Sequence, residues 1–228
     1  MGAHEKEPFV IPYITDGLIL YLDGIEQGDT ANVWTDLING LQYVKNSSTG
    51  ITFNDNNVAF GSSNNQCLYN SRAEFVNASA GTIEACYRDV PTSGTKTLFY
   101  SVGIGSSGYG GQGISFQFVG GNRVAFSAGN AVTRPKNGAW TAGATGTYSI
   151  SAARIYQNGV SKSFTTSTDY PSRINAVSVI GGNGSYQQTL GGKIHCIRIY
   201  NRQLTEEEVL FNQRIDNMRF NLGLTIPT

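Results

Sequence analysis

The sequence predicts an all-β fold, a sandwich of two antiparallel sheets with one helix near the C-terminus. Short runs of strand-forming residues recur along the chain, and turn-forming residues separate them. Glycine is frequent (28 of 228 residues) and only 14% of residues are charged, which suits short strands joined by many turns. Two tight hairpin signals, Gly120-Gly121 and Asn158-Gly159, require antiparallel neighbours. These observations favour a sandwich over a parallel α/β sheet.

The first predicted strand covers residues 17–23 and places Leu18, Leu20 and Leu22 on one face. The Asn158-Gly159 pair can supply the two positive φ angles of a type I′ turn. The remaining predicted strands cover residues 41–45, 57–60, 82–88, 97–102, 114–119, 123–127, 146–152, 155–157, 160–164, 176–180 and 193–200.

One helix is predicted from Thr205 onward. Thr205 and Glu208 have the spacing of a capping box, in which the threonine accepts from the N3 backbone and the glutamate accepts from the N-cap backbone. Phe211, Ile215 and Met218 follow at helical spacing. We expect this apolar stripe to dock on the sandwich.

The chain divides into an extended N-terminal arm (1–16), a sandwich domain (17–220) and a C-terminal tail (221–228). Pro8 and Pro12 disfavour helix in the arm. The arm and tail predict contacts with neighbouring subunits, in a homo-oligomer or a larger assembly.

Charge and hydropathy exclude several partners. Sixteen basic residues balance sixteen acidic ones, so no excess of positive charge marks a nucleic-acid-binding surface. The longest apolar stretch, Gly17 to Leu22, is too short to insert into a membrane. The N-terminal residues show no apolar signal-peptide core, although a processed signal would leave the same sequence.

The three cysteines, Cys67, Cys86 and Cys196, lie far apart in the sequence and form no CxxC motif. We expect three small buried thiols and no closed disulfide framework.

Residues 192–208 read Gly-Lys-Ile-His-Cys-Ile-Arg-Ile-Tyr-Asn-Arg-Gln-Leu-Thr-Glu-Glu-Glu. This run resembles the closing strand and helix of laminin-G-like, concanavalin A-like domains of bacteria and phages. Residues 17–24 with 34–37, residues 81–85 and residues 154–160 agree with the family in order. The resemblance covers residues 17–220 and implies a jelly-roll sandwich whose usual role is binding glycans or protein surfaces.

The same superfamily contains glucanases, so catalysis needs its own evidence. Retaining glucanases of this fold resemble one another in a strand with two carboxylates on one face, about 5 Å apart. Here the strand 82–88 offers Glu84 alone, with Cys86 and Arg88 on its face. His195 would have to serve any Ser-His-Asp triad, and no nucleophile elbow is present. The sequence therefore predicts a protein that is not an enzyme, with a glycoside hydrolase as the third hypothesis.

Calcium is the one candidate cofactor, because many lectin-like relatives use it. Asp23 and Asp36 lie near the opening strand and the Trp-Thr-Asp element, and Asp55 lies in an Asn-rich turn. Calcium prefers several oxygen ligands, usually with at least two carboxylates. A turn-forming role for Asp55, bonded to its own backbone, is the favoured alternative.

Sugar binding needs an aromatic face with amide or carboxylate partners around it. Trp140 lies in a polar segment without a strand pattern, and Tyr109 and Tyr186 lie in loops rich in Gly and Ser. Asn183 and Gln187 flank Tyr186. These five residues are the predicted ligand-binding residues, although a buried core position is an equal alternative for Trp140.

Two functional hypotheses follow. The first is a non-catalytic lectin-like module for glycan binding or adhesion. The second is a structural or decoration subunit of a phage particle or bacterial surface assembly, tied to its neighbours by the arm. Both predict an extracellular, cell-surface or virion location.

Overall fold

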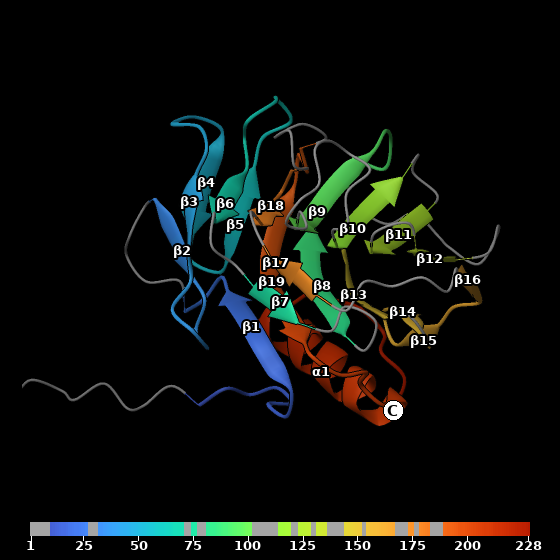
Figure 1. The fold of residues 1–228 in the computed structure, drawn as a ribbon. Coiled ribbons are helices and arrows are strands. Elements are labelled where there is room, and N and C mark those ends of the chain that lie inside the picture. The colour runs from blue at the N-terminus through green and yellow to red at the C-terminus, as the bar shows by residue number, and fades with distance from the viewer. Residues whose placement is uncertain are drawn as a thin grey trace, which may run out of the picture.

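A computed structural model describes residues 10–26, 32–70, 74–76, 81–101, 114–119, 123–128, 131–135, 144–151, 154–166, 173–175, 178–182 and 189–228. These residues form two large antiparallel sheets, a small two-stranded sheet and one helix (Figure 1). The predicted all-β sandwich with a C-terminal helix is confirmed.

The first large sheet, sheet A, follows the order β15-β14-β13-β8-β19-β5-β4, and β1 pairs with β19 beside β5. Its strands are β1 (Leu18–Asp23), β4 (Ile51–Asn54), β5 (Asn57–Phe60), β8 (Thr82–Arg88), β13 (Gly146–Ser151), β14 (Ile155–Gln157), β15 (Val160–Ser161) and β19 (Lys193–Tyr200).

The second large sheet, sheet B, follows the order β16-β12-β11-β10-β9-β18-β6-β3-β2. Its strands are β2 (Val33–Thr35), β3 (Gln42–Lys45), β6 (Leu68–Asn70), β9 (Lys96–Ser101), β10 (Ile114–Val119), β11 (Arg123–Ala128), β12 (Ala131–Pro135), β16 (Phe164–Thr166) and β18 (Ser178–Ile180). The small sheet pairs β7 (Glu74–Val76) with β17 (Arg173–Asn175).

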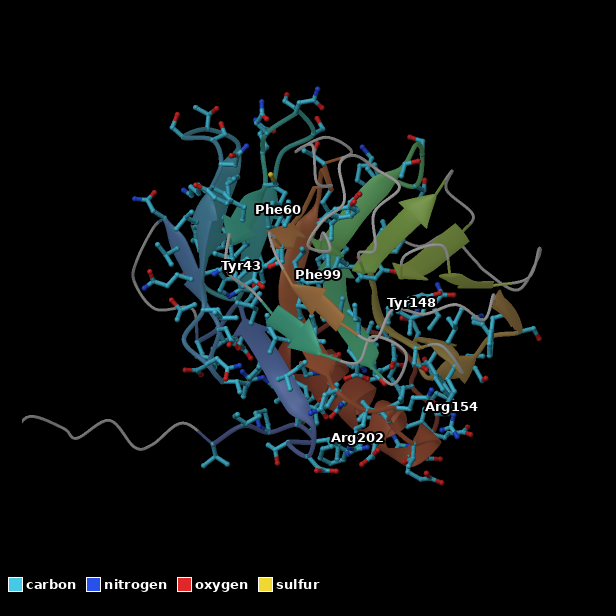
Figure 2. All side chains as sticks on the ribbon, viewed as in Figure 1. Tyr43, Phe60, Phe99, Tyr148, Arg154 and Arg202 are labelled. Atoms are coloured by element: carbon cyan, nitrogen blue, oxygen red, sulfur yellow. The ribbon has the colours of Figure 1, made fainter. Side chains whose placement is uncertain are left out.

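The main core lies between the two large sheets. Tyr43, Phe60 and Phe99, labelled in Figure 2, belong to it and come from strands of both sheets. In the central strand β8, Ile83, Ala85 and Tyr87 are core residues, which the period of two in a strand places on one face.

Helix α1 (Glu206–Arg219) covers the other face of sheet A and lies next to β1 in the lower part of Figure 1. Thr205 and Glu208 form the predicted capping box: the Thr205 side chain accepts from the Glu208 backbone, and Glu208 accepts from the Thr205 backbone. The Asn158-Gly159 turn is also confirmed, with φ angles of 51° and 78°. The Gly120-Gly121 turn lies outside the described residues, but the strands on either side of it, β10 and β11, form the predicted antiparallel hairpin, with Val119 opposite Arg123.

The predicted docking stripe of α1 is wrong for two of its three residues. Ile215 packs against the buried side chains beneath the helix, but Phe211 is 42% exposed and Met218 is 71% exposed. The buried side instead carries Asn212, Gln213 and Asp216 together with Val209. The reason is chemical: sheet A presents charged and polar side chains to α1, and these require polar partners when they are buried.

The described part of the arm is held against its own domain. Tyr13 is buried with residues of α1 and β19, and the Ile14 amide donates to Asn212 Oδ1 (3.1 Å). The tail is held as well, since Arg214 donates to the Pro227 carbonyl and Leu222 is buried. Residues 10–16 and 221–228 therefore pack against this domain. Residues 1–9 lie outside the described residues, and contacts of the arm and tail with neighbouring subunits stay a prediction.

Candidate functional site

A transverse row of side chains crosses sheet B on its outer face. Val44 of β3 lies opposite Tyr69 of β6, Tyr69 lies opposite Val179 of β18, and Val179 lies opposite Tyr100 of β9. We call these four residues the tyrosine row.

Alternation along the strands fixes the face of this row. Each of three row residues has a core residue next to it in its strand: Leu68 precedes Tyr69, Phe99 precedes Tyr100, and Ile180 follows Val179. Successive side chains in a strand point to opposite faces. The tyrosine row therefore lies on the side of sheet B turned away from the core.

The row combines two partly exposed tyrosines with a buried valine between them. Tyr69 and Tyr100 are partly exposed, whereas Val179 between them has no exposed surface. Because they lie two strand spacings apart, their backbones are separated by about 10 Å. Aromatic rings at this spacing can contact the apolar faces of neighbouring sugar units.

An amide side chain lies beside the row. Gln42 is exposed and shares the outer face with Val44, because the two are separated by one residue in β3. Asn70 Nδ2 donates to the Gln42 carbonyl (2.8 Å), which holds the end of β6 against β3. Gln42 thus supplies donor and acceptor groups at a position fixed by the sheet.

The five predicted ligand residues, Trp140, Tyr109, Tyr186, Asn183 and Gln187, lie outside the described residues. The strand ends that flank them are described. Ser101 of β9 lies opposite Ser178, at the start of β18, so the chain leaves β9 and β18 at opposite ends of sheet B. The segment with Tyr109 follows β9, and the segment with Asn183, Tyr186 and Gln187 follows β18.

The base of the segment that follows β18 is well anchored. The Leu190 amide donates to the Gly181 carbonyl, and the Gly181 amide donates to the Leu98 carbonyl, both at 2.9 Å. Gly181 has a φ of 76°, and a Cβ there would meet the Phe60 ring at 2.4 Å, so this position requires glycine.

The candidate calcium ligands Asp23 and Asp36 are engaged by protein donors. Asp23 Oδ1 accepts from the Ile25 amide, and its Oδ2 accepts from Arg219 and from the Tyr21 hydroxyl. Asp36 accepts from the backbone amides of Tyr21, Ile38 and Asn39. Both carboxylates are buried, and both accept hydrogen bonds from backbone amides; Asp23 is also bound by Arg219.

Asp55, unlike Asp23 and Asp36, is exposed; it lies in the turn between β4 and β5. Within the described ranges, no group of three or more His, Cys, Asp or Glu side chains is arranged to hold a metal ion.

A cluster of charged groups is buried between β8, β13, β19 and α1. Arg198 donates from Nε to Glu84 Oε2 (3.0 Å) and from its two terminal nitrogens to the Asp216 oxygens (2.7 and 2.8 Å). Asn212 also donates to Glu84 (2.7 Å), and Thr147 donates to Asp216 (2.6 Å). We call these five residues the Arg198 cluster; none has exposed surface.

Burial and the shared cation set the protonation of the two carboxyls. Burial raises the pKa of Glu84 to about 7, although Arg198 lowers it. Burial also acts to raise the pKa of Asp216, but its bidentate pairing with Arg198 leaves that pKa lowered. The Tyr13 ring lies over the guanidinium, 3.9 Å from its carbon. The Arg198 cluster is thus closed to a substrate and joins α1 to sheet A.

His195 is likewise a buried side chain. Its Nδ1 lies 2.8 Å from the Asn56 carbonyl, and its ring packs against Phe220. Burial lowers the pKa of His195, so the neutral imidazole is favoured.

The fold defines an all-β sandwich domain, and the sequence comparison identifies its family. Residues 55–210 match the family model Laminin_G_3, described as the concanavalin A-like lectin/glucanases superfamily. The chain belongs to this family. A search of curated proteins gave no match.

Solved structures with the same fold include the sialidase of Trypanosoma rangeli. Its complex with sialic acid matches with a TM-score of 0.60 and 14% identity, over 89% of this chain and 33% of that one. Its covalent intermediate with 2,3-difluorosialic acid matches with a TM-score of 0.60 and 16% identity, over 87% and 33%. This chain therefore spans about a third of the sialidase, and the likeness concerns the fold.

A weaker likeness exists to the Ruminococcus gnavus IT-sialidase CBM40, with a TM-score of 0.47 and 14% identity, over 64% of this chain and 98% of that chain. A TM-score at this level supports no further conclusion. Among the helical residues described here, no stretch is long and apolar enough to cross a membrane.

Proposed function

We propose that this chain is a non-catalytic glycan-binding module that holds its ligand on the outer face of sheet B. The tyrosine row carries the proposal: Tyr69 and Tyr100 flank the buried Val179 in a domain of the concanavalin A-like lectin/glucanases superfamily. Aromatic surface with amides beside it is the chemistry that sugar binding uses.

The placement of the carboxylates supports binding without covalent chemistry. A glycosidase needs two carboxyl groups flanking the scissile bond. Among the described residues, one pair of neighbouring carboxyls is Glu84 and Asp216, which Arg198 joins. Glu84 and Asp216 are sealed beneath α1 and have no exposed surface. A second pair, Asp16 and Glu208, is bound to Arg202, and Glu208 also caps α1. The glycoside hydrolase hypothesis therefore gains no support from them.

The structural-subunit hypothesis depended on an arm that reaches neighbouring chains. Residues 10–16 pack against their own domain, and residues 1–9 lie outside the described residues, so the structural-subunit hypothesis stays a prediction. The function that we propose is glycan binding outside the cell or at a cell surface.

A glycan array tests the proposal directly. Purified wild-type protein is screened with calcium and with a chelator, and each bound glycan is retested with Tyr100→Ala and Trp140→Ala. The proposal predicts saturable binding that Tyr100→Ala weakens at least about tenfold, as expected when an aromatic contact is removed. Phe211→Ala, on the solvent face of α1, is the matched control and should bind like wild type. Loss only in Trp140→Ala would move the site to the loops, and no binding by folded protein would reject the proposal.

A further inference from the structure

Two cysteines that are far apart in the sequence lie directly opposite each other in sheet A. Cys86 is in β8 and Cys196 is in β19, and the antiparallel register pairs them. Directly opposed residues point to the same face. Here that face is the one covered by α1, where both thiols are buried with the same group of side chains.

Opposed positions in antiparallel strands have the Cα–Cα distance of a disulfide and nearly its Cβ–Cβ distance. Their Cα atoms are about 4.5 or 5.5 Å apart, within the range of about 4.4–6.8 Å seen in disulfides. Their Cβ atoms lie about 4.5–5.5 Å apart, against about 3.5–4.5 Å in a disulfide. A closing movement of about 1 Å therefore suffices. An irregularity of the ladder lies beside the pair, between Ile194 and Cys196, where β19 can adjust.

We propose that Cys86 and Cys196 are a disulfide-forming pair that links the central strands of sheet A. Each thiol loses its hydrogen, a sulfur–sulfur bond forms, and two electrons pass to a disulfide oxidant. With oxidised glutathione, the bond of the oxidant breaks and two molecules of reduced glutathione are released.

The surroundings indicate when the bond forms. Both cysteines have no exposed surface, and Cys196 Sγ also contacts Arg198 (3.1 Å) and Asp216 (3.3 Å). Burial raises the pKa of both thiols, so the reactive thiolate is scarce in the folded protein. Oxidation therefore occurs during folding, before α1 covers the pair, and the folded reduced protein reacts slowly.

Cys67 provides a matched control. It is buried as well, and it precedes β6 in sheet B, whereas the proposed pair lies in sheet A. Cys67→Ser should leave the cross-link intact, and Cys86→Ala should abolish it. Because the bond would close a loop of about 110 residues, it should raise the melting temperature by about 5–15 °C.

The experiment refolds the denatured, reduced full chain with oxidised and reduced glutathione, and separately treats the folded reduced chain with the same mixture. Intact mass, thiol titration in denaturant and peptide mapping follow. The proposal predicts one Cys86–Cys196 link after refolding, one remaining thiol, little reaction of the folded chain, and the higher melting temperature. Three free thiols after refolding, or a link through Cys67, would overturn it. These measurements on the wild-type chain decide the question even if Cys86→Ala does not fold.

Discussion

Replacing Glu84 with glutamine should remove a specific pH dependence of stability. Glu84 is fully buried, and its pKa is about 7 in the folded chain against an ordinary value of 4.5. Between these values the folded chain holds a proton that the unfolded chain has released. Raising the pH therefore destabilises the fold through this group.

The size of the effect follows from the two pKa values. Each pKa unit corresponds to about 1.4 kcal/mol, so the free energy of unfolding should fall by about 2–3 kcal/mol between pH 5 and pH 8. Glu84→Gln keeps an acceptor for Arg198 and Asn212 but cannot ionise. The substitution should also lower the free energy of unfolding by about 1–3 kcal/mol at every pH, because an N–H of the buried glutamine amide would lack a hydrogen-bond partner.

Urea unfolding of both proteins at pH 5, 6, 7 and 8 measures the effect. His195 contributes with the opposite sign, since its lowered pKa makes the fold more stable as pH rises through 6.5. It is present in both chains, so their difference isolates Glu84. Glu207→Gln, an exposed glutamate of α1, is the control and should keep the wild-type slope. Parallel pH profiles for wild type and Glu84→Gln would show that Glu84 does not take up a proton on folding.

Three further predictions follow from the packing. Asp216→Ala should lower the free energy of unfolding by about 3–5 kcal/mol, because Arg198 would remain buried without its bidentate partner; urea unfolding at pH 7 measures this. On α1, Phe211→Ser should change stability by less than about 0.5 kcal/mol, whereas Val209→Ala should cost more than about 1 kcal/mol; the reverse order would contradict the orientation of the helix. Chelation should leave the melting temperature unchanged, since Asp23 and Asp36 are satisfied by protein donors; a drop in calorimetry would reveal a bound ion.

The sequence was most informative where local chemistry decides the structure. The capping box at Thr205 and Glu208 is confirmed, as is the Asn158-Gly159 turn, because each signal specifies its own backbone geometry. The strand pattern and the family resemblance together predicted the sandwich.

The docking face of α1 could not be predicted in the same way. Helical periodicity assumes that apolar side chains are buried. Here the sheet presents Arg198 and Glu84 to the helix, and a polar stripe ending in Asp216 covers them. Asn212 of α1 donates to Glu84, 128 positions earlier in the chain, and no local signal reveals this contact.

The tyrosine row was missed for a similar reason. Tyr100 lay in a predicted strand, but Tyr69 lay outside the predicted strands, although β6 alternates core and outer residues. Only the order β6-β18-β9 brings the two tyrosines to one face. The loop residues around Trp140 and Tyr186 stay a prediction.

The most direct test of glycan binding on sheet B is calorimetric titration of the strongest array glycan into wild type and Tyr69→Ala/Tyr100→Ala, with melting curves confirming that both are folded. We expect saturable binding by wild type and a loss of affinity of about a hundredfold in the double variant. Equal affinity of the two folded proteins would contradict it.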